Sequence, residues 1–278
     1  MIVRKSPAKV NLFLKVLRKR EDGYHDIATL MQRISIYDEM RFSLRGDRIS
    51  VFCPGSSIPE DEGNIAYRAA EALFSYVSYD SGVEISIVKT IPEAAGLGGG
   101  SSNAATTLVT LNELLECGLS AEQLMTIGAT IGADVPFFIF QKTAWAFGIG
   151  DQLYPAEKIP QMWFVVVNPG FEVSTKKVYE SLKFKLTNEG IKYTIPRFLK
   201  IPDVVDNLYN DLEEVTVKTY PVLLDIKEFL LSFGALGSLM SGSGPTVFGI
   251  FSTEDAARAA ADRAKNETSG TVFVAHSL

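Results

Sequence analysis

The chain has 278 residues, 46% of them hydrophobic and 22% charged, which is typical of a soluble globular protein with one large or two modest domains. A formal net charge of -6 offers no attraction for nucleic acid or an anionic membrane surface, so neither is an expected partner. Cys53 and Cys117 are too few for a disulfide framework, and no stretch resembles a membrane span or a cleaved signal. We therefore expect a cytoplasmic protein.

The N-terminal part of the chain is predicted to be rich in strands. Apolar residues alternate with others from Lys9 to Val16, which indicates a strand with one buried face and with Lys9 and Asn11 together on the other face. A turn follows at Gly23-Tyr24-His25. The next expected elements are strands over residues 34–44, 49–53 and 83–88 and a helix over residues 62–76.

A glycine-rich segment, Pro92-Glu-Ala-Ala-Gly-Leu-Gly-Gly-Gly-Ser-Ser-Asn103, joins a predicted strand to a predicted helix that Ser101, Ser102 or Asn103 would cap. Glycine has no Cβ, so the backbone can wrap closely around a ligand, and the helix directs its first N–H groups at an anion. We interpret the segment as a phosphate-binding loop. The alternative is a flexible linker, which would not normally lead straight into a capped helix.

Two familiar phosphate loops do not fit this segment. A Walker A loop needs Lys directly after its last Gly, and the chain contains no Gly-Lys pair. A dinucleotide fingerprint would need Gly in place of Ser101 or of Asn103. Neither a P-loop enzyme nor a Rossmann dehydrogenase is therefore expected.

The rest of the chain predicts segregated strands and helices, which indicates the α+β class. A capping box at Ser120 starts a helix to Ile131, and Pro136 disfavours helical geometry in the residue before it. A loose boundary near Asn168-Pro-Gly170 divides a phosphate-binding domain (1–168) from a substrate domain (169–278). The later expected elements are strands over 137–147, 163–167, 236–240, 246–251 and 271–275 and helices over 176–182, 208–217, 222–233 and 256–265.

A few polar residues and one further turn have two interpretations each when viewed alone. Asp134 is either a turn or cap residue or a carboxylate that accepts a hydroxyl proton, and Lys9 is either solvated or a charge that supports phosphoryl transfer. Tyr24 and His25 are either a half-buried surface pair or a base-binding pair. Met240-Ser-Gly-Ser-Gly-Pro245 is either a hairpin turn or a second wall of the phosphate site. No zinc site is expected, because Cys and His do not cluster.

Taken together, three ordered motifs resemble the GHMP small-molecule kinases, such as homoserine and mevalonate kinases. The motifs are Ser6-Pro-Ala-Lys-Val-Asn-Leu12, Pro92 to Ala105 and Met240 to Thr246, and the match extends over essentially the whole chain. Gly23-Tyr-His25 and Gly132-Ala-Asp-Val-Pro136 narrow the resemblance to members that phosphorylate a cytidine-diphosphate-linked methylerythritol in the non-mevalonate isoprenoid pathway. The resemblance implies the α+β GHMP kinase fold, with a β-rich N-terminal domain carrying a helical layer and a ferredoxin-like C-terminal domain.

The resemblance also implies residue roles. Lys9 and Asp134 match the catalytic pair, with Asp134 deprotonating or orienting the substrate's tertiary hydroxyl and Lys9 balancing charge. Tyr24 and His25 match the cytidine site, in which the tyrosine ring stacks on cytosine and the histidine bonds its edge. The other matches are Asn11, Thr175 and Tyr179 on the substrate side, and on the ATP side Pro92, Glu93, Ala94, Ala95, Gly96, Leu97, Gly98, Gly99, Gly100, Ser101, Ser102 and Asn103, with Asn64 and Lys89 at the adenine end.

The implied cofactors are ATP and Mg²⁺, and the implied partner is a small cytidine-diphosphate-linked substrate, with the protein a monomer or a homodimer. The sequence does not place an acidic magnesium ligand; Ser102 is one candidate, and phosphates, water and Asp134 are the other. Two alternatives remain for the function. One is a GHMP kinase for homoserine or mevalonate, which leaves Tyr24 and His25 without a role. The other is a nucleotide-binding regulator without turnover, against which Lys9 and Asp134 argue.

Overall fold

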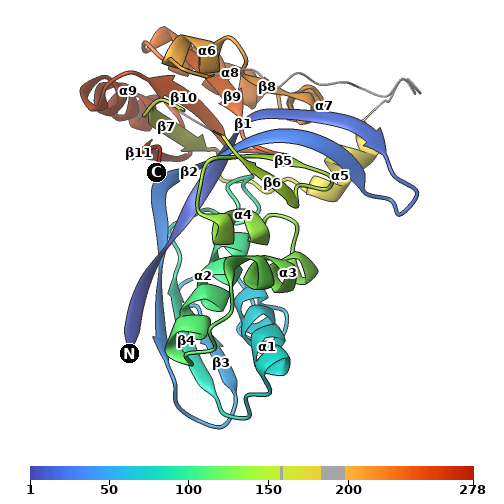
Figure 1. The fold of residues 1–278 in the computed structure, drawn as a ribbon. Helices are drawn as coiled ribbons and strands as arrows, with labels where there is room; N and C mark the ends of the chain where they lie inside the picture. The colour runs from blue at the N-terminus through green and yellow to red at the C-terminus, as the bar shows by residue number, and fades with distance from the viewer. Residues whose placement is uncertain (157–158, 183–197) are drawn as a thin grey trace. The chain divides into compact units, whose positions relative to one another are not determined.

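The computed structural model describes residues 1–156, 159–182 and 198–278, which form two compact units. The first unit contains residues 1–8, 36–93 and 98–142, and the second contains residues 9–35, 94–97 and 143–278. Two long strands, β1 (Ile2–Lys19) and β2 (His25–Ser43), contribute residues to both units (Figure 1). The predicted domain division between residues 168 and 169 follows chain order instead, and it stays a prediction.

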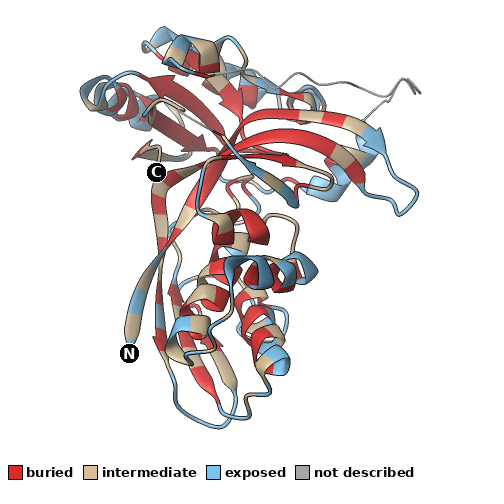
Figure 2. Ribbon diagram, viewed as in Figure 1, coloured by how far each residue is buried: buried red, intermediate tan, exposed pale blue. Residues whose placement is uncertain are grey.

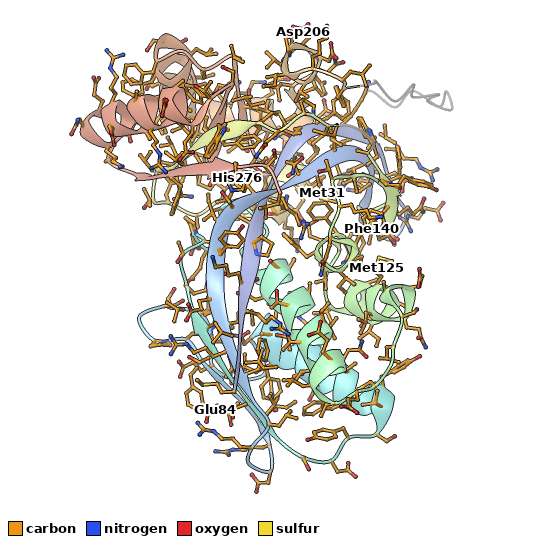
Figure 3. The ribbon with its side chains drawn as sticks, turned by 60° about the vertical axis from the view of Figure 1, so that its left-hand side comes forward. Met31, Glu84, Met125, Phe140, Asp206 and His276 are labelled. Carbon is orange, nitrogen blue, oxygen red and sulfur yellow. The ribbon has the colours of Figure 1, made fainter. Side chains whose placement is uncertain are left out.

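The first unit is a sheet with helices on one side (Figure 1). Its strand order is β3-β4-β2-β1, with β3 parallel to β4 and β4 antiparallel to β2. Figure 3 labels Glu84 on β4 and Met125 on α3, which identify the sheet and the helical layer. The remaining elements of this unit are β3 (Ile49–Phe52), β4 (Val83–Val88), α1 (Ile65–Val77), α2 (Gly99–Leu114), α3 (Ala121–Ile131) and α4 (Val135–Phe140).

Local sequence signals explain where the first helices begin. The side-chain oxygen of Asn64 accepts a hydrogen bond from the Ala66 N–H, which caps α1. The capping box predicted at Ser120 is present at the start of α3, where Ser120 and Gln123 each bond the other's backbone N–H. The buried residues of α1 recur at helical spacing and form one face of the helix; they are Ala66, Ala69, Ala70, Leu73 and Phe74. Figure 2 shows buried segments in both the sheet and the helices of this unit.

The second unit contains a four-stranded antiparallel sheet with the order β11-β7-β10-β9. Helix α8 packs on β9 and β10, and α9 packs on β7, β10 and β11. With the elements between β7 and α8 left aside, the order β7-α8-β9-β10-α9-β11 is ferredoxin-like, as predicted, although β7 lies before residue 169, where the predicted C-terminal domain begins. These elements are β7 (Trp163–Asn168), α8 (Val222–Ser232), β9 (Gly237–Met240), β10 (Val247–Phe251), α9 (Glu254–Glu267) and β11 (Thr271–His276).

Further strands of the second unit pair with its parts of β1 and β2. Strand β5 is antiparallel to β2 at residues 29–31 and to β6, and β8 is parallel to β1 at Phe13 and Leu14. The α+β class is therefore confirmed. The other elements of this unit are β5 (Ala144–Phe147), β6 (Gln152–Pro155), α5 (Thr175–Ser181), α6 (Ile201–Val205), β8 (Tyr209–Asn210) and α7 (Asp211–Thr219).

Three local predictions were wrong. Residues 137–147 are not one strand, because α4 occupies residues 135–140 and a strand begins only at residue 144. Helix α4 is buried nearly all round, so its sequence shows no helical periodicity. The proline in its first turn is tolerated there. None of Ser101, Ser102 and Asn103 caps α2, whose N-cap is Gly98. The strand around Lys9 has two buried faces rather than one, since residues 8–14 are all buried. Within the described ranges, no helix has the length and apolar character needed to cross a membrane.

We expect Ser120→Ala to lower the free energy of unfolding by about 1 kcal/mol, because it leaves the Gln123 N–H in the first turn of α3 without the capping hydroxyl. Urea denaturation measures the change. Thr126→Ala, an exposed position inside the same helix, is the matched control and should cost no stability, because alanine has the higher helix propensity. Equal effects of the two substitutions would contradict the capping interpretation.

Candidate active site

The backbone of the glycine-rich segment alternates in conformation. Ala94, Gly96 and Gly98 have φ of 46°, 76° and 70°, respectively, while the residues between them stay at negative φ. Alternation of this kind turns successive N–H groups toward one side, which forms a concave site for an anion. Helix α2 begins directly after Gly98, which has no side chain to cap its first N–H groups. The conformation thus fits the predicted phosphate-binding loop.

The second glycine-rich turn packs closely against this loop within the second unit. Ser241 Oγ donates a hydrogen bond to the Gly96 carbonyl oxygen at 2.9 Å. A Cβ on Gly96 would collide with the carbonyl oxygen of Ser241, so glycine is required at residue 96 by space as well as by its positive φ. The segment from Met240 to Pro245 also connects the paired strands β9 and β10. The segment is therefore a hairpin turn, and it bonds the glycine-rich loop through Ser241; its role as a second wall of the phosphate site stays a prediction.

Lys9 and Asn11 lie beside the same contact. The Lys9 N–H donates to the Leu97 carbonyl at 2.9 Å, and the Asn11 N–H donates to Ser241 Oγ at 3.3 Å. Lys9 Nζ donates to Asn11 Oδ1 at 2.6 Å, so the two side chains share one face of β1 as predicted. Both residues are buried, and a buried ammonium group is stable only with polar neighbours of this kind.

Residues of α7 and its N-cap, which the sequence did not single out, hold the second turn in place. Asn210 Nδ2 donates to the carbonyls of Met240 and Gly242 at 2.8 and 2.7 Å. Thr216 Oγ1 donates to the Ser243 carbonyl at 3.1 Å. Asn210 also caps α7, and an Asn before an acidic first turn is a recognisable cap signal. That signal predicts the helix start, but it contains nothing about a turn thirty residues further along the chain.

The structure brings part of the predicted cytidine site together. The rings of His25 and Tyr179 are stacked, with centroids 5.0 Å apart and an interplanar angle of 26°. Thr175 Oγ1, one helical turn before Tyr179, lies 2.7 Å from Ser243 Oγ. Tyr24 differs from these residues, because 60% of its surface is exposed. The stacking role of Tyr24 stays a prediction.

The environment of His25 favours its neutral form. Burial is the main cause that lowers its pKa below the ordinary value of 6.5, and the positive charge of Lys19 adds to the effect. A neutral imidazole ring offers one N–H donor and one acceptor nitrogen. This combination suits the edge of a pyrimidine base, which presents both kinds of group.

Within the first unit, Lys89 lies beside the start of α2. Its ammonium group pairs with Asp38 and donates to Asn103 Oδ1 at 3.3 Å, and a Cβ on Gly99 would lie 3.3 Å from Lys89 Nζ. Asn64 is committed to structure, because its Oδ1 caps α1 and its Nδ2 donates to the Pro59 carbonyl at 2.6 Å. The adenine-end roles of Lys89 and Asn64 stay predictions.

The structure also gives neighbours for two further residues predicted to bind ATP, Glu93 and Ser101. Glu93 accepts hydrogen bonds from the hydroxyls of Ser56 and Ser57. A Cβ on Gly132 would lie 3.9 Å from Ser101 Oγ, so the segment leading to Asp134 adjoins the first turn of α2.

Asp134 is half-buried at the N-cap position of α4, yet its side chain makes no capping hydrogen bond. Asp134 also lies in the turn of residues 133–134, so the choice between a turn residue and a catalytic carboxylate stays open. Asp134 belongs to the first unit and Lys9 to the second, and their joint role stays a prediction.

The described part of the chain offers no cluster of acidic or histidine ligands for Mg²⁺. Among the described residues, no group of three or more His, Cys, Asp or Glu side chains could hold a metal ion. Ser102 is fully buried, and its hydroxyl accepts a hydrogen bond from Ser6 Oγ at 2.8 Å. Mg²⁺ in kinases commonly keeps several waters and binds one or two carboxylates together with substrate phosphates. The described residues therefore do not form a magnesium site from protein ligands alone.

Cys53 is a buried free thiol. Burial raises its pKa to about 11, helped by the negative charge of Glu60. Neither cysteine forms a disulfide.

Comparison with known proteins decides the family. Residues 64–142 match the GHMP kinases N terminal domain, and residues 202–269 match the GHMP kinases C terminal domain. A 4-diphosphocytidyl-2-C-methyl-D-erythritol kinase of Syntrophus aciditrophicus is 58% identical over 92% of this chain and 91% of its own length. The chain belongs to the GHMP kinases, in the family of 4-diphosphocytidyl-2-C-methyl-D-erythritol kinases.

Two further comparisons agree with this family. A kinase of the same name from Geobacter metallireducens is 51% identical over 99% of this chain and 98% of its own length. A crystal structure of 4-(cytidine 5'-diphospho)-2C-methyl-D-erythritol kinase superposes with a TM-score of 0.84 and 33% identity, and 99% of each chain is covered. As a GHMP kinase, the chain is an ATP-dependent phosphotransferase, and the GHMP fold predicted from its three motifs is confirmed.

We expect an NMR titration of His25 to give a pKa below 6.5, because burial and Lys19 disfavour the charged ring. As pH falls through 6.5, the His25 side chain takes up a proton in the unfolded chain before it does so in the folded protein. The free energy of unfolding therefore decreases as the pH falls. The chain has two histidines, and His25→Gln assigns the signals. Lys19→Gln should raise the measured pKa slightly. A titration midpoint at or above the ordinary value would contradict this description of the site.

Proposed function

We propose that this kinase transfers the γ-phosphoryl group of ATP to the 2-hydroxyl of 4-diphosphocytidyl-2-C-methyl-D-erythritol, a step of the non-mevalonate pathway to isoprenoid precursors. The observation that carries the proposal lies in the second unit. There the backbone of Lys9 and Asn11 bonds to Leu97 of the glycine-rich loop and to Ser241 of the turn that supports it. The backbone of the predicted catalytic lysine is thus hydrogen-bonded to the loop that we assign to the ATP phosphates.

The proposed chemistry needs one base and fixed positive charge. A bond forms between the 2-hydroxyl oxygen and the γ-phosphorus, the bond from that phosphorus to the bridging oxygen of ADP breaks, and the hydroxyl proton passes to Asp134. Lys9 balances the negative charge that develops, and its bond to Asn11 fixes the direction of the ammonium group. Phosphoryl transfer depends mainly on such positioning and electrostatic stabilisation, so a small number of well-held groups suffices.

We assign the cytidine end of the substrate to Tyr24, His25 and Tyr179. The Tyr179 ring stacks on the His25 ring, and the environment of His25 favours the neutral imidazole, which supports this assignment. An aromatic face can stack on a base, while the imidazole ring bonds the edge of the base. Thr175 and Asn11 complete the proposed substrate residues.

We also propose that Mg²⁺ arrives with ATP and is held chiefly by its phosphates and by water, since the described residues supply few ligands. When bound, the ion would neutralise charge on the phosphates. Consumption of ATP and two free cysteines fit a cytoplasmic enzyme. A monomer or a homodimer is compatible with this function.

The two alternatives raised from the sequence have less support. A kinase for homoserine or mevalonate would have no use for the stacked pair of His25 and Tyr179. A regulator without turnover would have no reason to bury Lys9 at the loop, where an ammonium group is costly to desolvate.

We expect Asp134→Asn to lower kcat by at least about 100-fold, because the amide cannot accept the hydroxyl proton. The dissociation constant for ATP should change by less than about threefold, since the nucleotide residues stay intact. Asp80→Asn, an exposed position in the same unit, is the matched control and should behave like the wild type. Turnover near the wild-type rate in Asp134→Asn would rule out the assigned role.

A further inference from the structure

One fully buried carboxylate joins both flanks of the glycine-rich loop. Asp38 lies on β2 in the first unit and has no exposed surface. Its Oδ1 accepts hydrogen bonds from the N–H groups of Thr90 and Ile91 at 2.8 and 2.9 Å, immediately before the loop begins at Pro92. Its Oδ2 accepts from Asn103 Nδ2 at 3.0 Å, at the end of the same segment.

The carboxylate also fixes the predicted ATP-binding lysine. Lys89 Nζ pairs with Asp38 Oδ2 and contacts Asn103 Oδ1, and it lies beside Gly99 at the first turn of α2. Asn103 Nδ2 donates in addition to Ser6 Oγ at 2.9 Å, and Ser6 Oγ donates to Ser102 Oγ. The network of Asp38 therefore reaches three residues that belong to our proposed ATP site.

Four donors surround this carboxylate, two from the backbone and two from side chains. A buried charge is tolerated only when it is fully bonded, and four donors fill the acceptor sites of a carboxylate. Asp38 consequently has no capacity left for a ligand. Any effect on catalysis must act through the groups that it holds.

We propose that Asp38 is a positioning residue of the ATP site: it fixes Lys89 and both ends of the loop in the nucleotide-binding geometry before ATP arrives. The inference rests on the proposed function, in which the loop holds the phosphates. Binding to a preorganised site avoids the cost of ordering the loop. Loss of the bonds that Asp38 makes therefore weakens ATP binding selectively and leaves the affinity for the alcohol substrate nearly unchanged.

Asp38→Asn tests the proposal with little change in volume. The carbonyl oxygen of asparagine can still accept from Thr90 and Ile91, but its NH₂ group then faces two donors, Asn103 Nδ2 and Lys89 Nζ. We expect the dissociation constant and the KM for ATP to rise about tenfold, while the KM for the alcohol changes by less than about twofold. Calorimetry with ATP alone measures binding without the alcohol substrate.

Leu73→Ala is the control for a purely structural effect, because Leu73 is a fully buried residue of α1 in the same unit. It should lower Tm by a comparable amount and leave ATP affinity at the wild-type value. Should Asp38→Asn fail to fold, Asp38→Glu keeps the charge for Lys89 but displaces the bonds to the backbone, and it should weaken ATP binding at least about threefold.

Unchanged ATP affinity in the folded Asp38 variant, or an equal loss in Leu73→Ala, would overturn the proposal. The measurement of ATP binding needs no assumption about which alcohol is the substrate. If the wild-type enzyme bound ATP but did not phosphorylate the cytidine-linked alcohol, the proposed function would fail while the result for Asp38 would stand.

Discussion

The close approach of two backbone segments at Gly96 is the constraint on which the conformation of the glycine-rich loop depends. Ser241 bonds the Gly96 carbonyl through its hydroxyl, and its own carbonyl oxygen occupies the space that a Cβ on residue 96 would need. Asn11 bonds the same hydroxyl, so the strand that carries Lys9 is joined to both glycine-rich turns. Residues far apart in the sequence are in this way held at fixed separations, which is what phosphoryl transfer requires of a protein.

Each of the two units contains a buried charged residue that is bonded to polar neighbours. Lys9 in the second unit and Asp38 in the first are both buried and both bonded to neighbouring polar atoms. Breaking such a network exposes uncompensated charge, so it resists rearrangement more strongly than apolar packing does. Within the first unit, this resistance to rearrangement is the physical basis of our proposal for Asp38.

The sequence predicted the features that depend on local chemistry. Alternation around Lys9 correctly placed Lys9 and Asn11 on one face, and the cap signal at Ser120 marked the start of α3. Prediction from the sequence failed where tertiary structure decides the outcome. The all-apolar residues 135–140 have no periodicity that would indicate a helix, and the N-cap of α2 is Gly98 rather than a residue with a capping side chain. Asn210 and Asp38 escaped notice because their partners lie far away in the sequence. A single sequence contains no signal for such pairs.

The most direct test of the account is a comparison of alcohol substrates. The purified enzyme would be incubated with ATP and Mg²⁺ and, in separate reactions, with the cytidine-diphosphate-linked methylerythritol, unlinked methylerythritol, homoserine and mevalonate, with products identified by mass. We predict that a phosphate group is added to the cytidine-linked alcohol, and that the other three react at least about 100-fold more slowly because they lack the base that His25 and Tyr179 would bind. Equal or faster phosphorylation of homoserine, mevalonate or the unlinked alcohol would contradict the account.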